Sequence, residues 1–257
     1  MNDQKQHIIS ESQKYKKDIR INKINKIKDM NDKNLLHKIT NQNKYLYNKF
    51  KNVTNYEITN SNTLIILDWD DTLFPTSWAS KYNINISNSK TRILYEDFFK
   101  DLDNILFTFL TNLIKQGTIY IITNATSEWV KISSIILVKT YNFINNNKIQ
   151  IISARTLYEK KHAPSEWKKH AFKDVILKEF KNANIMNVIS VGDSEYEHNA
   201  LIEMSKIYTD KIKFLKSFKL MLNPNYNTIV DELSVLNNIH PEIWHSYKQI
   251  CKTFVQI

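Results

Sequence analysis

The sequence predicts an α/β protein in which a parallel sheet is flanked by helices. Four short apolar runs, at residues 64–67, 118–122, 148–153 and 187–191, are rich in β-branched residues and indicate buried strands. Segments with apolar residues at helical spacing separate these runs. Strands that alternate with helices are typical of a parallel sheet with helices packed on its faces.

The segments between the strands are predicted as follows. Residues 76–92 are polar and irregular, which indicates a loop. Apolar residues at helical spacing predict a helix over 94–116, and Gly117 is a suitable C-cap residue for it. A second helix is expected over 127–140. Pro164 opens a third helix, over 165–181, with Ser165 as its N-cap.

The C-terminal part is predicted to close the domain. Residues 211–220 alternate in places like an outer strand, and residues 225–236 and 241–255 have the pattern of helices. Four apolar residues share one face of the last predicted helix and are expected in the core: Trp244, Tyr247, Ile250 and Phe254.

The positive charge of the chain is concentrated in its first sixty residues. Of the net charge of +10, residues 1–60 contribute 13 Lys and Arg against 6 Asp and Glu, a balance of +7. Residues 1–60 therefore form a basic, Lys- and Asn-rich extension, helical or partly disordered, and residues 61–257 form the main domain. Such an extension can bind nucleic acid, an anionic membrane or an acidic partner, although a solvated helix face or a partly disordered arm is the simpler interpretation.

Several classes of protein are disfavoured by the composition. No run of eighteen apolar residues predicts a membrane span, and residues 1–5 lack the apolar segment of a secretory signal. The single cysteine, Cys251, does not support a disulfide framework. Neither glycine lies in a dinucleotide-binding or P-loop motif. An intracellular protein, cytoplasmic or nuclear, is expected.

Three carboxylates follow the first predicted strand. Asp68, Asp70 and Asp71 come directly after residues 64–67, and Thr72 and Pro75 follow them. The carboxyl ends of parallel strands are where ligands bind, and strand alternation separates Asp68 and Asp70 from Trp69. Carboxylates that share a site repel each other unless one is protonated, binds a metal or meets a cationic ligand. The alternative is a helix N-cap with incidental acidic neighbours.

Asp68-x-Asp70-x-Thr72 resembles the first motif of the haloacid dehalogenase (HAD) superfamily, and the stretch 68–73 is similar to that of uncharacterised HAD-like proteins of protists and fungi. The resemblance implies a Rossmann-like, HAD-type sheet. Thr123, at the end of the second strand, matches the second motif, which binds the phosphoryl group. Gly192-Asp193 matches the fourth motif, with Glu197 four residues later.

The third motif of that family is a lysine, and three candidates lie on the helix predicted over 165–181. These are Lys168, Lys169 and Lys173, of which Lys168 best matches the usual separation from the fourth motif. The alternative for each of them, and a strong one in this Lys-rich chain, is a solvated surface cation. Arg155, after the third strand, could reach an anionic substrate or pair with Glu159.

The resemblance implies a magnesium-dependent phosphatase. Asp68 would attack phosphorus, Asp70 would act as the acid and base, and Thr123 and Lys168 would stabilise the phosphoryl group. Asp193 and the backbone carbonyl of Asp70 would hold Mg²⁺ beside Asp68, and Glu197 would support the metal site by holding its ligands in position. The residues expected around the substrate are Asp71, Thr72, Asn124 and Arg155.

The spacing of the motifs leaves no room for a full cap domain between motifs one and two or between motifs two and three. An open site favours a macromolecular phosphate, on a protein or at a nucleic-acid end, as in capless Asp-x-Asp-x-Thr phosphatases. A small metabolite remains an alternative. A different class of function is a non-catalytic phosphate-binding or scaffolding module tethered by its basic extension.

Overall fold

A parallel sheet forms the centre of the computed structural model, which describes residues 57–182, 185–247 and 250–253. Within these residues the sheet has six strands, all parallel, in the order β3-β2-β1-β4-β5-β6. The strands are β1 (Thr63–Leu67), β2 (Thr118–Thr123), β3 (Gln150–Ser153), β4 (Asn187–Gly192), β5 (Phe214–Lys219) and β6 (Ile250–Thr253). The predicted parallel sheet is therefore confirmed, in the arrangement of a Rossmann-like fold.

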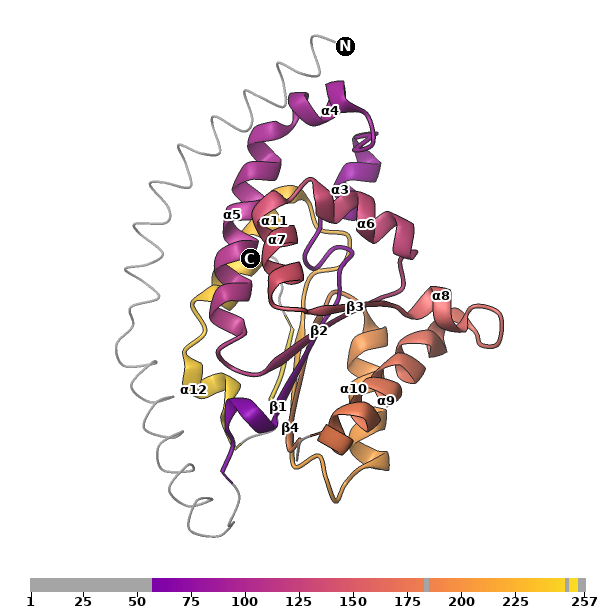
Figure 1. Ribbon diagram of the computed structural model, residues 1–257, viewed down its shortest axis with the longest axis vertical. Coiled ribbons are helices and arrows are strands. Elements are labelled where there is room, and N and C mark those ends of the chain that lie inside the picture. The colour runs from indigo at the N-terminus through magenta and orange to yellow at the C-terminus, as the bar shows by residue number, and fades with distance from the viewer. Residues whose placement is uncertain (1–56, 183–184, 248–249, 254–257) are drawn as a thin grey trace. The chain divides into compact units, whose positions relative to one another are not determined.

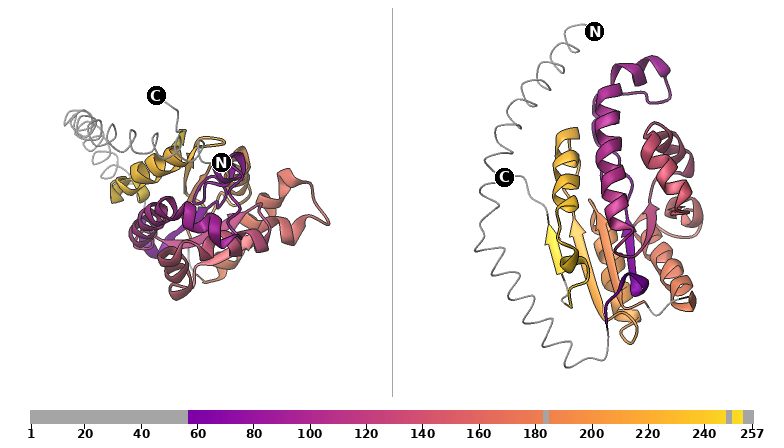
Figure 2. Two further views of the ribbon diagram at one scale, coloured as in Figure 1. Left: turned by 90° about the horizontal axis from the view of Figure 1, so that it is seen from above. Right: turned by 60° about the vertical axis from the view of Figure 1, so that its left-hand side comes forward.

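Helices cover both faces of the sheet (Figures 1 and 2). The helical elements are η1 (Asn60–Asn62), α3 (Thr76–Lys81), α4 (Ser89–Leu94), α5 (Glu96–Leu113), α6 (Ser127–Ile135), α7 (Val138–Asn146), α8 (Ala154–Tyr158), α9 (Pro164–Asn182), α10 (Glu195–Ile207), α11 (Tyr226–Asn237) and α12 (Pro241–Trp244). Helices α5, α7 and α11 contribute to one core cluster, and α9 and α10 contribute to the other.

Strand β1 lies in the middle of the sheet because every one of its residues can be buried. Ile65 and Leu67 face the core beneath α5 and α11, whereas Leu64 and Ile66 face α9 and α10. All four side chains are at most 1% exposed. At about 1.5–3 kcal/mol for each large aliphatic side chain, this burial is a major source of stability for the centre of the fold.

The region between β1 and β2 differs from the prediction. Residues 76–92, predicted as a loop, contain α3 and most of α4. Two polar side chains supply the helix-starting hydrogen bonds. Asp71 accepts from the backbone N–H of Ser77 at 2.8 Å, and Asn88 accepts from that of Lys90 at 2.9 Å. Caps of this kind stabilise short helices that have little apolar periodicity.

The helix predicted over 127–140 is divided into α6 and α7. The break is held by Asp103 of α5, whose buried carboxylate accepts from the backbone N–H groups of Lys139 and Thr140, both at 2.8 Å. A side chain far away in sequence therefore caps α7, and helical periodicity alone cannot reveal such a partner.

Gly117 was predicted to cap α5, and this prediction is wrong. It lacks a positive φ, and a Cβ placed on it would lie 2.5 Å from the backbone oxygen of Thr63. The glycine is therefore needed for the close approach of two chain segments near the start of β1 and β2.

The C-terminal prediction is wrong in part. Trp244 and Tyr247 are buried, as expected, but the helix α12 ends at Trp244. The chain then forms β6, which pairs with β5 and makes β5 an inner strand. Backbone hydrogen bonding along an otherwise open sheet edge outweighs the helical spacing of the apolar residues here.

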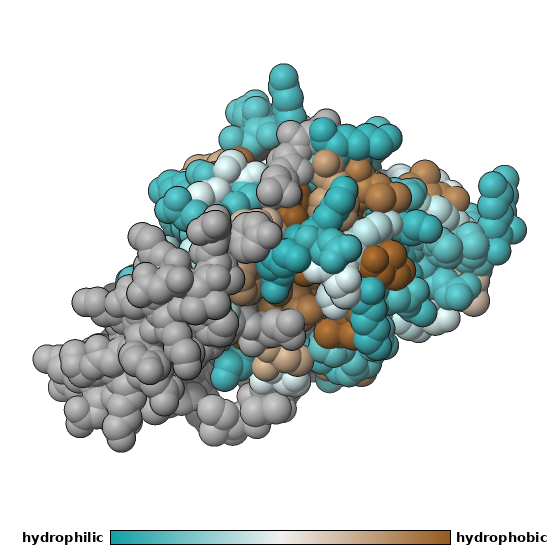
Figure 3. Space-filling view, turned by 90° about the horizontal axis from the view of Figure 1, so that it is seen from below, coloured by the Kyte–Doolittle hydropathy of each residue, from teal (hydrophilic) through white to brown (hydrophobic). Residues whose placement is uncertain are grey.

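Residues 1–56, which include nearly all of the predicted basic extension, lie outside the described residues. Figure 3 views the molecule from below Figure 1, where hydrophilic side chains are interspersed with smaller hydrophobic areas. Among the residues that the structure describes, no helix combines the length and the apolar character needed to cross a membrane.

Candidate active site

The carboxyl ends of three neighbouring strands bring the predicted site residues together. Strand β1 lies between β2 and β4, so Asp68, Thr123 and Asp193 are at the same edge of the sheet. The backbone N–H of Asp68 donates to the carbonyl of Val191 at 2.9 Å, which extends the pairing of β1 and β4 to the site itself.

A tight turn after β1 directs the carboxylates. The carbonyl of Trp69 accepts from the backbone N–H groups of Leu73 and Phe74, both at 2.9 Å. Asp71 adopts a φ of 52°, in the left-handed region that a turn of this kind requires. The side chain of Trp69 is fully buried in the core and stacks on Phe74. The predicted separation of Trp69 from Asp68 and Asp70 is confirmed.

Lys168 connects two buried carboxylates at the centre of the site. Its Nζ lies 2.7 Å from Oδ1 of Asp68 and donates to Oε1 of Glu197. The three side chains are no more than 6% exposed. Of the three candidate lysines, Lys168 is the one that lies beside Asp68, whereas Lys169 pairs with Glu203 at 3.0 Å. Burial makes the pairing necessary, because an unpaired charge there would be costly.

Glu197 is fixed from a second direction. Its Oε2 accepts from the backbone N–H of Ser194 at 3.1 Å and from Ser194 Oγ at 2.8 Å, which forms a capping box at the start of α10. Both carboxylate oxygens therefore have protein partners. Glu197, included in the predicted metal set, holds Lys168 in place rather than directing a free oxygen toward a metal.

Asp70 is half-buried and has two hydrogen-bond donors. Thr76 Oγ1 donates to its Oδ1 at 2.5 Å, and Trp129 Nε1 donates to the same oxygen at 2.8 Å. Burial raises the pKa of Asp70, and the negative charge of Asp68 adds to the increase, while the two hydrogen bonds oppose it. A carboxyl group with a raised pKa is suited to proton transfer.

Asp193 is 7% exposed and completes the acidic group. Burial, together with the charges of Asp68 and Asp71, raises its pKa to about 7, and Lys168 opposes the increase. Clustered carboxylate oxygens are the ligands that hard divalent cations prefer. The carboxylates of Asp68 and Asp193 therefore fit a magnesium ion, which would relieve their mutual repulsion.

The residues predicted to bind the substrate differ in whether their polar atoms already have partners within the protein. Asp71 uses both oxygens to accept from Ser77, so it also orders the loop. Within the described residues, Thr72 Oγ1 and Asn124 Oδ1 are buried without a hydrogen-bond partner, which leaves them available to a ligand. Thr123 Oγ1 accepts from the backbone N–H of Ala125 at 3.0 Å. Arg155 pairs with Glu159 at 2.9 Å, as one of the two alternatives predicted.

A cleft of about 750 Å³ opens beside Asp70. Its polar lining includes Asn83 and Asn85, from the loop after α3, Asn124, which follows β2, and Arg155 of α8. Trp129 forms part of the wall. The lining combines these amides and one guanidinium with the apolar side chains of Ile84 and Trp129, so the cleft can contact both polar and apolar parts of a ligand.

Three residues around Asp70 and Asp71 were not predicted from the sequence: Thr76, Ser77 and Trp129. Thr76 and Ser77 follow Pro75, a pattern typical of the start of a helix. The pattern could have indicated these residues, but the whole segment 76–92 was predicted as a loop. Trp129 reaches Asp70 from α6 only because β2 and β1 are neighbours. Comparison of the chain with protein-family models, curated proteins and solved structures finds no match.

Proposed function

We propose that the chain is a magnesium-dependent phosphomonoester hydrolase of the HAD type, working through an aspartyl-phosphate on Asp68. The observation that carries the proposal is the buried contact between Asp68 Oδ1 and Lys168 Nζ, 2.7 Å apart, at the carboxyl edge of the sheet. A carboxylate can attack an anionic phosphate only if positive charge lies beside both groups.

In the first step a carboxylate oxygen of Asp68 forms a bond to phosphorus, and the bond from phosphorus to the leaving oxygen breaks. Asp70 transfers its proton to that leaving oxygen, which departs as an alcohol. Lys168 offsets the charge on Asp68 and on the phosphoryl group. The hydroxyl of Thr72, which has no partner among the described residues, is available to donate to a phosphoryl oxygen, whereas the Oδ1 of Asn124 can only accept from a donor group of the substrate.

In the second step water attacks phosphorus and the bond to Asp68 breaks. Asp70, now ionised, takes a proton from the water, so inorganic phosphate leaves and both aspartates return to their starting states. The carboxylates of Asp68 and Asp193 and the backbone carbonyl of Asp70 would hold Mg²⁺, which leaves the carboxyl group of Asp70 for proton transfer. When bound, the ion supplies positive charge that offsets the repulsion between Asp68 and the phosphate.

The cleft beside Asp70 could receive the body of a substrate with both polar and apolar parts. Its volume of about 750 Å³ accommodates a small molecule or the tip of a macromolecule that carries a phosphate. The segment between β1 and β2 contributes α3, which borders this cleft, so the entrance is shaped by short helices of the main domain.

The test is hydrolysis of an aryl phosphate by the full chain with Mg²⁺, with and without a chelator. Asp68→Asn should abolish turnover, and Asp210→Asn, a change of the same chemistry on an exposed turn, should not alter it. Turnover that survives Asp68→Asn refutes the proposed nucleophile. If a panel of phosphoproteins, nucleic-acid ends and metabolites also gives no turnover, phosphate binding without catalysis becomes the better account.

A further inference from the structure

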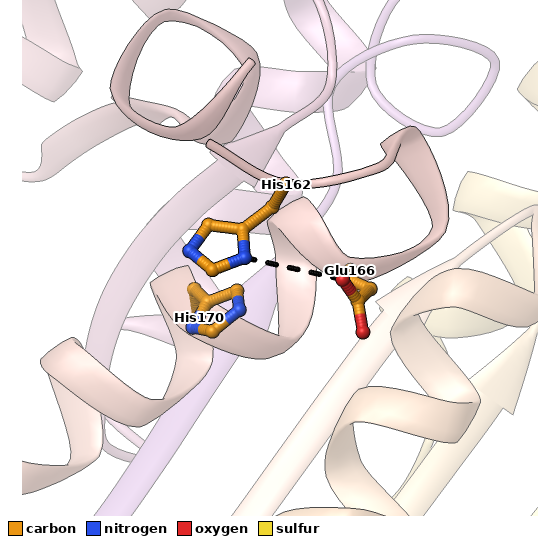
Figure 4. A group of neighbouring side chains, drawn as sticks. All are labelled: His162, Glu166 and His170. Carbon is orange, nitrogen blue, oxygen red and sulfur yellow. Dashed lines mark ion pairs between the residues drawn. The ribbon is translucent and has the colours of Figure 1, made fainter. Parts of the chain in front are cut away.

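A cluster of two histidines and a glutamate lies at the start of α9, apart from the acidic site (Figure 4). Glu166 and His170 belong to α9, and His162 belongs to the segment between α8 and α9. One ligand atom from each residue lies within 4.8 Å of the other two. His162 Nδ1 lies 3.9 Å from Glu166 Oε2, and the two imidazole rings are 3.8 Å apart between centroids.

The positions of these side chains are set by the backbone around them. Glu166 and His170 are four residues apart on a helix, so they lie on the same face one turn apart. The backbone N–H of His162 donates to the carbonyl of Tyr158 at 3.0 Å. Its own carbonyl accepts from Trp167 Nε1 at 2.8 Å. The loop histidine is therefore tied to α9 independently of its imidazole ring.

An aromatic side chain limits the movement of both rings. The ring of Tyr158 lies 5.3 Å from that of His170 and 6.1 Å from that of His162, between centroids. The hydroxyl of Tyr158 donates to Asp174, one turn beyond His170 on α9. Tyr158, which this hydrogen bond holds in place, therefore packs beside both imidazole rings, whereas Glu166 is exposed to solvent.

We propose that His162, Glu166 and His170 bind a transition-metal ion of the zinc class. Two imidazole nitrogens and one carboxylate oxygen are a ligand set that zinc accepts, and one position is left for water. Magnesium prefers oxygen ligands, so the cluster selects a different ion from the acidic site. In four-coordinate zinc sites, neighbouring ligand atoms are about 3.3 Å apart. The ligand atoms of His162, Glu166 and His170 lie within 4.8 Å of one another. Side-chain rotations that shorten the longest of these distances by about 1.5 Å would therefore complete the site.

The inference does not depend on phosphatase activity. Lys168 lies between Glu166 and His170 in sequence, but its side chain is buried against Asp68 on the other side of the helix. An ion bound at the cluster would join the segment after α8 to the first turns of α9. Its direct consequence is a more stable connection between these elements.

The test is titration of the metal-free full chain with Zn²⁺ by calorimetry, in the presence of excess Mg²⁺. We expect one zinc site in the wild type, and at least a tenfold weaker affinity in His162→Ala and in His170→Ala. His240→Ala is the matched control, because His240 lies 3.8 Å from Glu242 but has no third ligand in the described part of the chain. Its zinc affinity should equal that of the wild type.

Two further measurements distinguish the cluster from the acidic site and from misfolding. Asp193→Asn should leave the zinc affinity unchanged. Zn²⁺ should raise the thermal unfolding temperature of the wild type but not of Glu166→Gln, and without metal these two proteins should unfold at similar temperatures. Absent zinc binding, or zinc binding that the histidine variants retain, would overturn the proposal.

Discussion

Gly192 and Glu197 are so close that the glycine cannot carry a side chain in this arrangement. A Cβ on Gly192 would lie 2.5 Å from Cγ of Glu197 and 2.8 Å from Oε2. The missing side chain creates the space that Glu197 fills, and Glu197 in turn holds Lys168 against Asp68. A glycine at the end of β4 therefore determines the position of a lysine on α9.

We predict that Gly192→Ala displaces Glu197 and disrupts the Asp68–Lys168 contact. Overpacking of this kind should lower the free energy of unfolding by about 1–3 kcal/mol, measured by urea denaturation. The proposed phosphatase activity per folded molecule should fall as well. Gly117→Ala is the matched control, since its Cβ would meet Thr63 at the opposite edge of the sheet. It should destabilise the fold without reducing the activity of the folded molecules.

Lys168→Met should be far more harmful than Lys169→Met. Removal of Lys168 leaves Asp68 and Glu197 buried without their counter-charge, which typically costs about 3–5 kcal/mol of stability. Lys169 pairs with Glu203 near the surface, where an ion pair contributes about 1 kcal/mol or less. Chemical denaturation of both variants checks the difference. Equal effects would show that Lys168 is not the central charge of the site.

Trp129→Phe tests the hydrogen bond to Asp70. The ring contact with Phe74 can remain, while the indole N–H that donates to Asp70 Oδ1 is lost. Because that bond stabilises the ionised carboxylate, its loss should raise the pKa of Asp70 further. In the proposed reaction the limb of the pH–rate profile that reports Asp70 should move to higher pH, and kcat should fall about tenfold. An unchanged profile would exclude Asp70 as the titrating acid and base.

Lys216 should make stability depend on pH. Burial lowers its pKa from 10.5 to about 7, and its Nζ donates to Asn187 Oδ1 at 2.5 Å. Between pH 7 and 10.5 the unfolded chain binds more protons at this residue than the folded chain. Stability from this residue should therefore increase as the pH rises, by about 2 kcal/mol between pH 7 and pH 9.

The measurement is the free energy of unfolding of the wild type and Lys216→Met at several pH values. The variant should lack the part of the increase that Lys216 contributes. Lys206→Met changes an exposed lysine on α10 and should follow the wild type. If Lys216→Met keeps the full increase, Lys216 is charged in the folded protein throughout this range.

The strands and most of the long helices were predictable because buried positions are occupied by apolar residues, whose spacing within one segment indicates a strand or a helix. β1 is a continuous apolar run because both of its faces are covered, and α5 has its apolar residues at helical spacing because one face packs on the sheet. The carboxylates after β1 were predictable for the same reason, since a polar group that follows a buried strand lies at the edge of the sheet.

Features that depend on partners far away in sequence were not predictable in this way. The break between α6 and α7 depends on Asp103, and the strand β6 depends on the open edge of β5. Neither partner alters the local pattern of the segment that it affects. The local pattern therefore predicted a single helix in each place.

The amino-acid sequence by itself determined the α/β class, the sequence positions of strands β1 to β4 and the acidic group at the end of β1. Only the tertiary structure decided which lysine faces Asp68, that Trp129 binds Asp70, and that His162 joins Glu166 and His170. The physical reason is that hydrophobic periodicity acts within one element, whereas a charge or a hydrogen bond is satisfied by whichever side chain the packing of several elements brings near.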